Sequence, residues 1–105
     1  MTTNSLEISV SEANNCDNTL LLDVRKPSEL EICKIEGALH IPMNEILNQL
    51  DKLPSDKRIA IFCHHGGRSL SITQTLRNAG HSNVFSMSGG IHSWATEIDT
   101  NLSTY

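Results

Sequence analysis

The sequence lacks any long apolar run and any excess of positive charge. No apolar stretch approaches the roughly 20 residues of a membrane span. The formal net charge of −4 argues against nucleic acid or an anionic membrane as a partner. The first five residues have neither the basic nor the apolar region of a signal peptide. We therefore expect a cytoplasmic protein with no membrane and no nucleic-acid partner.

Paired cysteines, internal repeats and low-complexity tracts are also missing. Cys16, Cys33 and Cys63 are an odd number with no close pair, which argues against a disulfide framework. Such thiols suit a reducing compartment, where a free cysteine can be catalytic. A chain of 105 residues is predicted to form one domain over residues 1–105, with loose tails at 1–5 and 98–105.

Apolar segments alternate between two periodicities along the chain. Strands are predicted at 6–10, 20–24, 58–62 and 83–87, and helices at 11–13, 27–31, 43–53, 69–79 and 91–97. The segment 33–42 is expected to be irregular. Strands that alternate with helices predict an α/β fold with a central parallel sheet of about four to five strands, flanked by helices on both faces.

Several residues mark where the predicted helices begin and end. Ser11 is the expected cap of the first helix, and Pro27 fits the first turn of the second. Gly80 is a suitable residue just past the end of the helix that we expect at 69–79. The clearest apolar periodicity belongs to the third helix, whose spaced residues are Met43, Ile46, Leu47, Leu50 and Leu53.

The segment from Cys63 to Ser69 joins the strand 58–62 to the helix 69–79 and reads Cys-His-His-Gly-Gly-Arg-Ser. It places a thiol at the carboxyl end of a strand and near a helix amino terminus, whose unpaired N–H groups stabilise a thiolate. Gly66 and Gly67 allow the backbone to turn so that successive N–H groups form an anion-binding nest. Such a loop suits a nucleophilic cysteine, a persulfide built on it, or an oxyanion.

This loop resembles the active-site loop of rhodanese-like domains, whose pattern is Cys-x-x-Gly-x-Arg. Two further stretches agree with the family in order and spacing, so the resemblance covers roughly residues 6 to 96. They are the early Asp-x-Arg segment with its Gly-Ala-x-x-Ile-Pro continuation (21–29 and 35–42), and the Gly-Gly and Trp ending (88–94). The resemblance implies a rhodanese-like fold and a sulfurtransferase.

Roles for the loop residues follow from the residues together with this resemblance. Cys63 is the expected catalytic nucleophile; the alternative is an inert buried thiol. Arg68 is expected to bind an anionic substrate or to brace the loop. His64 and His65 are expected to line the pocket and to supply backbone N–H groups. Gly66, Gly67 and Ser69 complete the predicted substrate-binding set.

Metal and cofactors are not expected at this loop. Adjacent residues in one tight turn rarely supply three ligands, so Cys63, His64 and His65 alone make a poor metal site. The sequence therefore predicts no metal and no cofactor.

Other candidates lie outside the loop. Asp23 and Arg25 are expected to approach the loop from a neighbouring strand end and to brace it, with substrate contact as the alternative. Cys33 is expected to pack in the interior rather than to resolve a persulfide. Cys16 is expected to be an exposed thiol without a role, and Trp94 to anchor the last helix.

The resemblance implies a thiosulfate sulfurtransferase. The donor is thiosulfate or another small anionic persulfide donor, and the acceptor is cyanide, a thiol or a sulfur-carrier protein. One alternative is a persulfide carrier or regulatory binding module without turnover. A cysteine phosphatase or arsenate reductase is disfavoured, because those loops have five residues between cysteine and arginine and this one has four.

Overall fold

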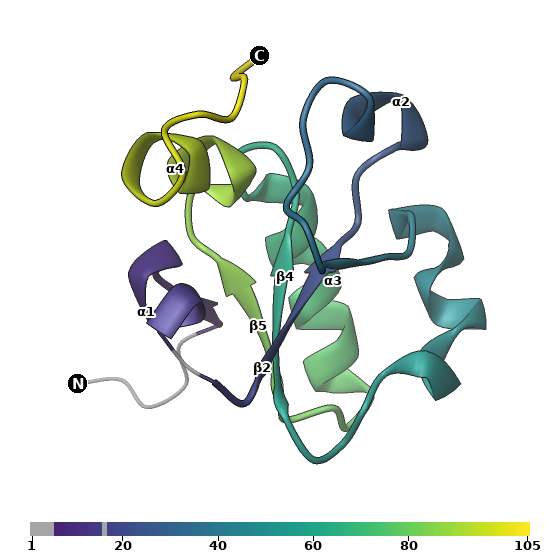
Figure 1. Cartoon of the computed structure of the whole chain (residues 1–105). Helices are drawn as coiled ribbons and strands as arrows, with labels where there is room; N and C mark the ends of the chain where they lie inside the picture. Colours follow the sequence, from purple (N-terminus) through teal and green to yellow (C-terminus); the bar gives the residue numbers. More distant parts are fainter. Residues whose placement is uncertain (1–5, 16) are drawn as a thin grey trace.

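All five strands of the sheet run parallel in the computed structural model, which describes residues 6–15 and 17–105 (Figure 1). The strand order is β1-β5-β4-β2-β3, so β4 is central. The strands are β1 (Glu7–Ile8), β2 (Thr19–Asp23), β3 (Leu39–His40), β4 (Arg58–Phe62) and β5 (Val84–Met87). The α-helices are α1 (Val10–Asn15), α2 (Pro27–Leu30), α3 (Gly67–Asn78) and α4 (Gly90–Glu97), and the 3₁₀ helices are η1 (Met43–Asn48) and η2 (Leu50–Lys52). The predicted parallel α/β sheet with helices on both faces is confirmed.

The two faces of β4 belong to two separate hydrophobic clusters, because successive side chains of a strand point to opposite faces. Ile59 and Ile61 pack with residues of α3 and η1 on one face. Ala60 and Phe62 pack with α1 and α4 on the other. Figure 1 shows α1 and α4 together on one side of the sheet and α3 on the other. The central strand is therefore covered on both sides, as its apolar sequence requires.

The amino-terminal helix begins earlier than predicted, at Val10. Its cap is Ser9, whose hydroxyl oxygen accepts the N–H of Glu12 at 3.0 Å, so the assignment of the cap to Ser11 is wrong. Val10 is 2% exposed, and it belongs to helix α1 and to the hydrophobic core rather than to a strand. The strand is accordingly only two residues long.

The segment 43–53 is not the regular α-helix that its periodicity predicts. It forms two 3₁₀ helices closed by i→i+3 bonds, among them Gln49 N–H to the Ile46 carbonyl at 3.1 Å. The apolar periodicity did not distinguish the two helix types, because apolar residues three positions apart lie on one face of a 3₁₀ helix as well as of an α-helix. Ile46 is fully buried, whereas Leu47, predicted on the same apolar face, is 58% exposed.

Smaller differences concern the ends of elements. Helix α3 begins at Gly67, two residues before the predicted start, and Ala79 follows it at the surface. Gly80 has φ of +100°, which confirms its role beyond the helix end. The segment 33–42, predicted as irregular, contains the short edge strand β3 beside β2.

The carboxyl-terminal segment differs from the loose tail that the sequence predicts. The ring of Tyr105 stacks on the ring of His64, with centroids 3.7 Å apart, and its hydroxyl makes two hydrogen bonds. The end of the chain therefore lies at the same end of the molecule as α2 and α4 (Figure 1). The predictions for residues 1–5 and for Cys16 lie outside the described residues. No helix among the described residues is long and apolar enough to cross a membrane.

Candidate active site

Cys63 directly follows β4, and its sulfur lies inside the turn that leads to α3. Sγ accepts the backbone N–H of Gly66 at 3.1 Å and that of Ser69 at 3.4 Å. Gly66 has φ of +117°, a conformation that favours glycine, and this residue caps α3. The nest is thus formed by Gly66 and Ser69. The backbone N–H groups of His64 and His65, expected to contribute, make no hydrogen bond to Sγ among the described residues.

The carbonyl groups of the same loop face the start of α4. Ile91 N–H donates to the Cys63 carbonyl at 2.8 Å, and His92 N–H donates to the His64 carbonyl at 3.1 Å. These bonds satisfy N–H groups that the first turn of a helix otherwise leaves unpaired. Gly90 makes the approach possible, since it has φ of +62° and a Cβ there would collide with both carbonyl groups. Helix α4 thereby fixes the loop so that its amides, not its carbonyls, face the sulfur.

A buried pair of hydroxyl groups lies beside the thiol. Ser69 Oγ is 3.6 Å from Cys63 Sγ, 3.2 Å from the Gly66 carbonyl and 2.7 Å from Ser86 Oγ. Both serines are fully buried. Since a hydroxyl rotates freely, Ser69 can accept from a thiol or donate to a thiolate while Ser86 supplies its other bond.

The thiol itself is covered. Cys63 is 1% exposed and belongs to the same hydrophobic cluster as Ile61 and Ile72. Two of the loop N–H groups are directed at its sulfur, those of Gly66 and Ser69 and not those expected from His64 and His65, and the thiol is less exposed than a freely accessible nucleophile. A reagent can reach Sγ only when the covering groups move.

Arg68 points to the acidic side chain of Glu29 in α2. The two terminal nitrogens of Arg68 donate to the two carboxylate oxygens at 2.7 and 2.9 Å, a bidentate ion pair. The side chain of Arg68 is 34% exposed, and its remaining N–H groups, out of the five of a guanidinium, are available to an anion. The hydrogen bond from Arg68 holds the pKa of Glu29 well below its usual range, although burial opposes this effect.

Asp23 and Arg25 form a buried ion pair at the end of β2. Arg25 NH2 lies 2.8 Å from Asp23 Oδ2, and Arg25 also donates to the carbonyl groups of Glu29 and Cys33 and to the Tyr105 hydroxyl. All five of its N–H groups are used, because Nε also donates to Asp23. The pair therefore braces the segment that carries Glu29, and Glu29 in turn holds Arg68.

The rings of His64, His65 and Tyr105 cluster at the rim of the loop. The centroids of His64 and His65 are 3.9 Å apart, and Tyr105 stacks on His64 with an interplanar angle of 5°. Burial and the neighbouring His65 lower the pKa of His64. A third imidazole, that of His92, joins them from α4, with one ring nitrogen of each histidine within 4.8 Å of the others.

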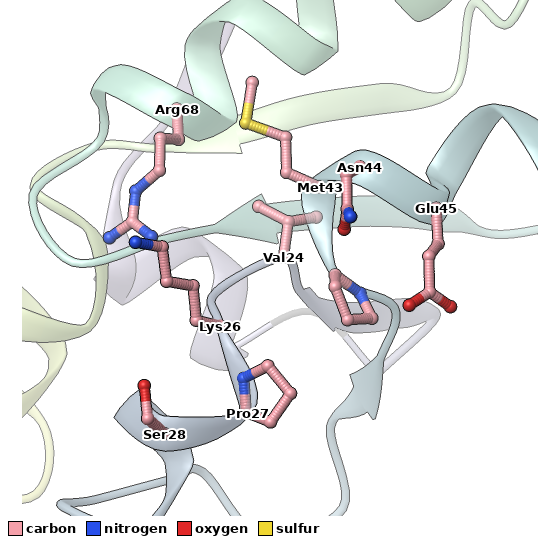
Figure 2. A pocket seen from close by; sticks show the side chains of 9 residues that line it. Val24, Lys26, Pro27, Ser28, Met43, Asn44, Glu45 and Arg68 are labelled. Atoms are coloured by element: carbon pink, nitrogen blue, oxygen red, sulfur yellow. The ribbon is translucent and has the colours of Figure 1, made fainter.

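A pocket of about 730 Å³ adjoins the loop on the side of Arg68. In Figure 2 the cationic ends of Arg68 and Lys26 extend toward each other across one end of it. The lining residues come from the end of β2, α2 and η1: Val24, Lys26, Pro27, Ser28, Pro42, Met43, Asn44, Glu45 and Arg68. The wall is mainly apolar and carries two cations, Arg68 and Lys26, and one carboxylate, Glu45, so its positive charge lies at the end where Arg68 and Lys26 meet.

The two remaining sequence candidates are structural. Cys33 is a free, buried thiol that packs in the cluster with Phe62, on the face of β4 opposite to that of Cys63. This supports packing over a resolving role. Trp94 is 7% exposed in the same cluster and anchors α4, as predicted.

Sequence reasoning missed Glu29, Ser86, His92 and Tyr105. Glu29 stands in the quoted Asp-x-Arg segment and could have been noticed as the acid available to Arg68. No local pattern indicates the other three, because each approaches the loop only through the folding of β5, α4 or the chain end.

Comparisons with known proteins identify a family. The model of the rhodanese-like domain matches residues 9–97. A sulfurtransferase of Allochromatium vinosum is 34% identical over 79 residues, 75% of this chain and 74% of that protein. The adenylyltransferase and sulfurtransferase UBA4 of Meyerozyma guilliermondii is 33% identical over an alignment of 108 positions that covers 93% of this chain. The chain spans only 26% of that protein. The crystal structure of a rhodanese-related protein from Thermoplasma volcanium has a TM-score of 0.77 and 30% identity, covering 88% of this chain and 92% of that one.

Proposed function

The chain belongs to the rhodanese-like domain family, and from this we propose that it transfers a sulfane sulfur through a persulfide on Cys63. The observation that carries the proposal is the sulfur at the end of β4 with the N–H groups of Gly66 and Ser69 directed at it. Backbone donors fixed in this way stabilise negative charge on Sγ, and on a second sulfur bound to it, without reorganisation during the reaction.

The proposed transfer has two steps, each a nucleophilic displacement at sulfur. The Cys63 thiolate attacks the outer sulfur of thiosulfate, the S–S bond of the donor breaks, and sulfite leaves with the bonding electron pair. Cys63 then carries a terminal sulfur with a negative charge. An acceptor (cyanide, a thiol or a sulfur-carrier protein) attacks this sulfur and releases the Cys63 thiolate. No metal or cofactor takes part in either step.

Arg68 and the pocket beside it serve the anionic substrate in this proposal. The guanidinium keeps N–H groups free of Glu29, and Lys26 lies on the same pocket wall. These cations attract thiosulfate and offset the charge on departing sulfite. Because Cys63 is 1% exposed, the proposal requires the covering groups to move before the donor enters.

Two other functions could use the same site, a persulfide carrier without thiosulfate turnover and a phosphatase or arsenate reductase. A persulfide carrier uses the same Cys63 chemistry but delivers sulfur to one partner, and a Bacillus subtilis relative that is 31% identical over 95 residues is named a putative sulfur carrier protein. A reducing compartment such as the cytoplasm suits either role. Phosphatase or arsenate reductase activity is disfavoured by the four residues between Cys63 and Arg68, since a shorter loop makes a smaller cradle.

Intact-protein mass measurement after treatment with thiosulfate tests the proposal. We expect wild type to gain one sulfur atom, Cys63→Ser to gain none, and the matched control Cys33→Ser to behave as wild type. Subsequent cyanide should remove the added sulfur and yield thiocyanate. A persulfide that cyanide leaves in place favours the carrier, and Cys63-dependent hydrolysis of an aryl phosphate favours the phosphatase. Sulfur gain by Cys63→Ser contradicts the assignment of the nucleophile.

A further inference from the structure

Three imidazole rings that are separated in the sequence meet at the rim of the Cys63 loop. His64 and His65 follow Cys63, whereas His92 comes from the first turn of α4. The hydrogen bond from His92 N–H to the His64 carbonyl at 3.1 Å holds the two segments together. Each of the three histidines has one potential ligand nitrogen, and these three atoms all lie within 4.8 Å of one another.

Two of the three rings carry a nitrogen that nothing else uses. Among the described residues, His64 Nε2 and His92 Nδ1 are buried and have no hydrogen-bond partner. A buried polar atom without a partner is costly, so its presence calls for an explanation. The two atoms belong to two rings of one cluster, whose centroids lie 6.4 Å apart, and a ligand that accepts lone pairs from both would satisfy them together.

We propose that His64, His65 and His92 form a binding site for a divalent transition-metal ion of borderline softness, such as Zn²⁺. Imidazole nitrogens are preferred ligands of Zn²⁺, Cu²⁺ and Ni²⁺, and three of them leave a coordination position open. The Tyr105 ring stacks on the His64 ring with centroids 3.7 Å apart and so restrains the orientation of this candidate ligand.

The observed spacing permits coordination after a small adjustment. Zn–N bonds of about 2.0–2.1 Å in a tetrahedral site place ligand nitrogens about 3.4 Å apart. The three nitrogens lie within 4.8 Å of one another, so a pair of them must close by up to about 1.4 Å. The His64 and His65 rings, whose centroids are 3.9 Å apart, must also rotate so that their lone pairs converge. His65 is exposed and can rotate. Tyr105 stacks on the face of the His64 ring, whereas a metal binds in the ring plane, so the stacking does not block it.

Occupation of this site should inhibit sulfur transfer, a consequence that rests on the proposed function. His64 and His65 directly follow Cys63 in the chain, so a bound cation stands beside the loop that carries the thiol and restrains it. The ion is therefore a regulator or inhibitor and not a cofactor of the transfer.

Titration of the purified protein with Zn²⁺ in a calorimeter tests the binding site without reference to activity. We expect one ion per chain, and a loss of affinity of at least about tenfold in His92→Gln, because even outer partners of metal ligands contribute 10–100-fold. The matched control is His81→Gln, which removes a histidine outside the cluster and should bind as wild type. Cys63→Ser should also retain binding. Equal affinity of His92→Gln and wild type contradicts the site, and a loss confined to Cys63→Ser moves the ion to the thiol.

Two further measurements separate the site from the proposed function. The ring signals of His64, His65 and His92 in NMR spectra should change on adding Zn²⁺, while those of His40 and His81 should not; the reverse pattern contradicts the site. In the transfer assay, Zn²⁺ should inhibit wild type more strongly than His92→Gln, each relative to its own metal-free rate. Binding at the three histidines in a protein without transfer activity overturns the proposed function alone.

Discussion

At the residue scale, Glu29 connects groups whose proximity the sequence did not reveal. Its carboxylate accepts hydrogen bonds from both terminal nitrogens of Arg68, from the Tyr105 hydroxyl at 2.7 Å and from the Lys26 N–H at 3.0 Å. Arg68 near a helix amino terminus is unfavourable by itself, because the helix dipole repels a cation there. Glu29 offsets that cost and fixes the direction of the guanidinium.

Replacing Arg68 separates substrate binding from bracing. Arg68→Ala should raise the KM for thiosulfate by about tenfold or more, since a charge-assisted contact with an anion is lost. It should cost only about 1–2 kcal/mol of stability, because the ion pair is partly exposed and Glu29 keeps two other donors. Steady-state kinetics and thermal melting measure both effects, with Arg68→Lys as the control that keeps charge but loses the bidentate geometry. A collapse of the melting temperature with an unchanged KM identifies Arg68 as a structural brace.

The single tyrosine offers a direct measure of the packed chain end. Burial, followed by the hydrogen bond to Glu29, raises the pKa of Tyr105 to about 12 from the ordinary value of 10.0. Because Tyr105 is the only tyrosine, the absorbance of tyrosinate during alkaline titration reports this group alone. We expect a midpoint near 12, with circular dichroism confirming that the protein remains folded. A midpoint near 10 in the folded protein means that the ring is not held as described.

At the scale of elements, the loop between β4 and α3 depends on helix α4, which comes later in the chain. The first turn of α4 binds the carbonyl groups of Cys63 and His64, and Gly90 permits the contact. The sequence predicted β4, the cysteine after it and most of α3, because apolar runs and glycine signals are local. The hydrogen bonds between α4 and the loop join segments that are distant in the sequence, so no local pattern indicates them.

The 3₁₀ segment provides a paired test of side-chain orientation. Ile46 is fully buried and Leu47 is 58% exposed, although both belong to the apolar series predicted for one helix face. Ile46→Ala should cost about 2–5 kcal/mol of stability through lost burial and a cavity. Leu47→Ala should stay within about 0.5 kcal/mol. Urea unfolding of the two variants measures the difference. Equal losses of stability would contradict the 3₁₀ geometry and favour the regular α-helix predicted from the sequence.

At the scale of the whole molecule, two buried or half-buried ion pairs join β2, α2 and α3 around the site. The Asp23–Arg25 pair is almost completely enclosed, and the Glu29–Arg68 pair lies at the edge of the pocket. Their hydrogen bonds to Tyr105 connect the chain end to the edge of the sheet at which Cys63 follows β4. The same charged side chains therefore contribute to the stability of the fold and to the shape of the site.

Acid should weaken the fold partly through Glu29. Its pKa in the folded protein is held below the ordinary 4.5, first of all by the hydrogen bond from Arg68. The carboxylate thus contributes stability that is fully present above 4.5 and is lost as the pH falls toward and through the depressed value. We expect Glu29→Gln to be less stable than wild type by about 1–2 kcal/mol near neutral pH, and the gap to narrow in acid. Urea unfolding between about pH 7 and pH 3 measures it, and a gap independent of pH contradicts this role.

The sequence alone determined the alternation of strands and helices, the parallel sheet, and the place of Cys63 at the end of a buried strand. These features follow from apolar periodicity and from glycine, which act over a few residues. Only the tertiary structure decided that Glu29 holds Arg68, that Tyr105 covers His64, that His92 joins two other histidines, and that the thiol is enclosed. Those contacts join segments far apart in the chain, and their geometry is fixed by the packing of whole elements around the sheet.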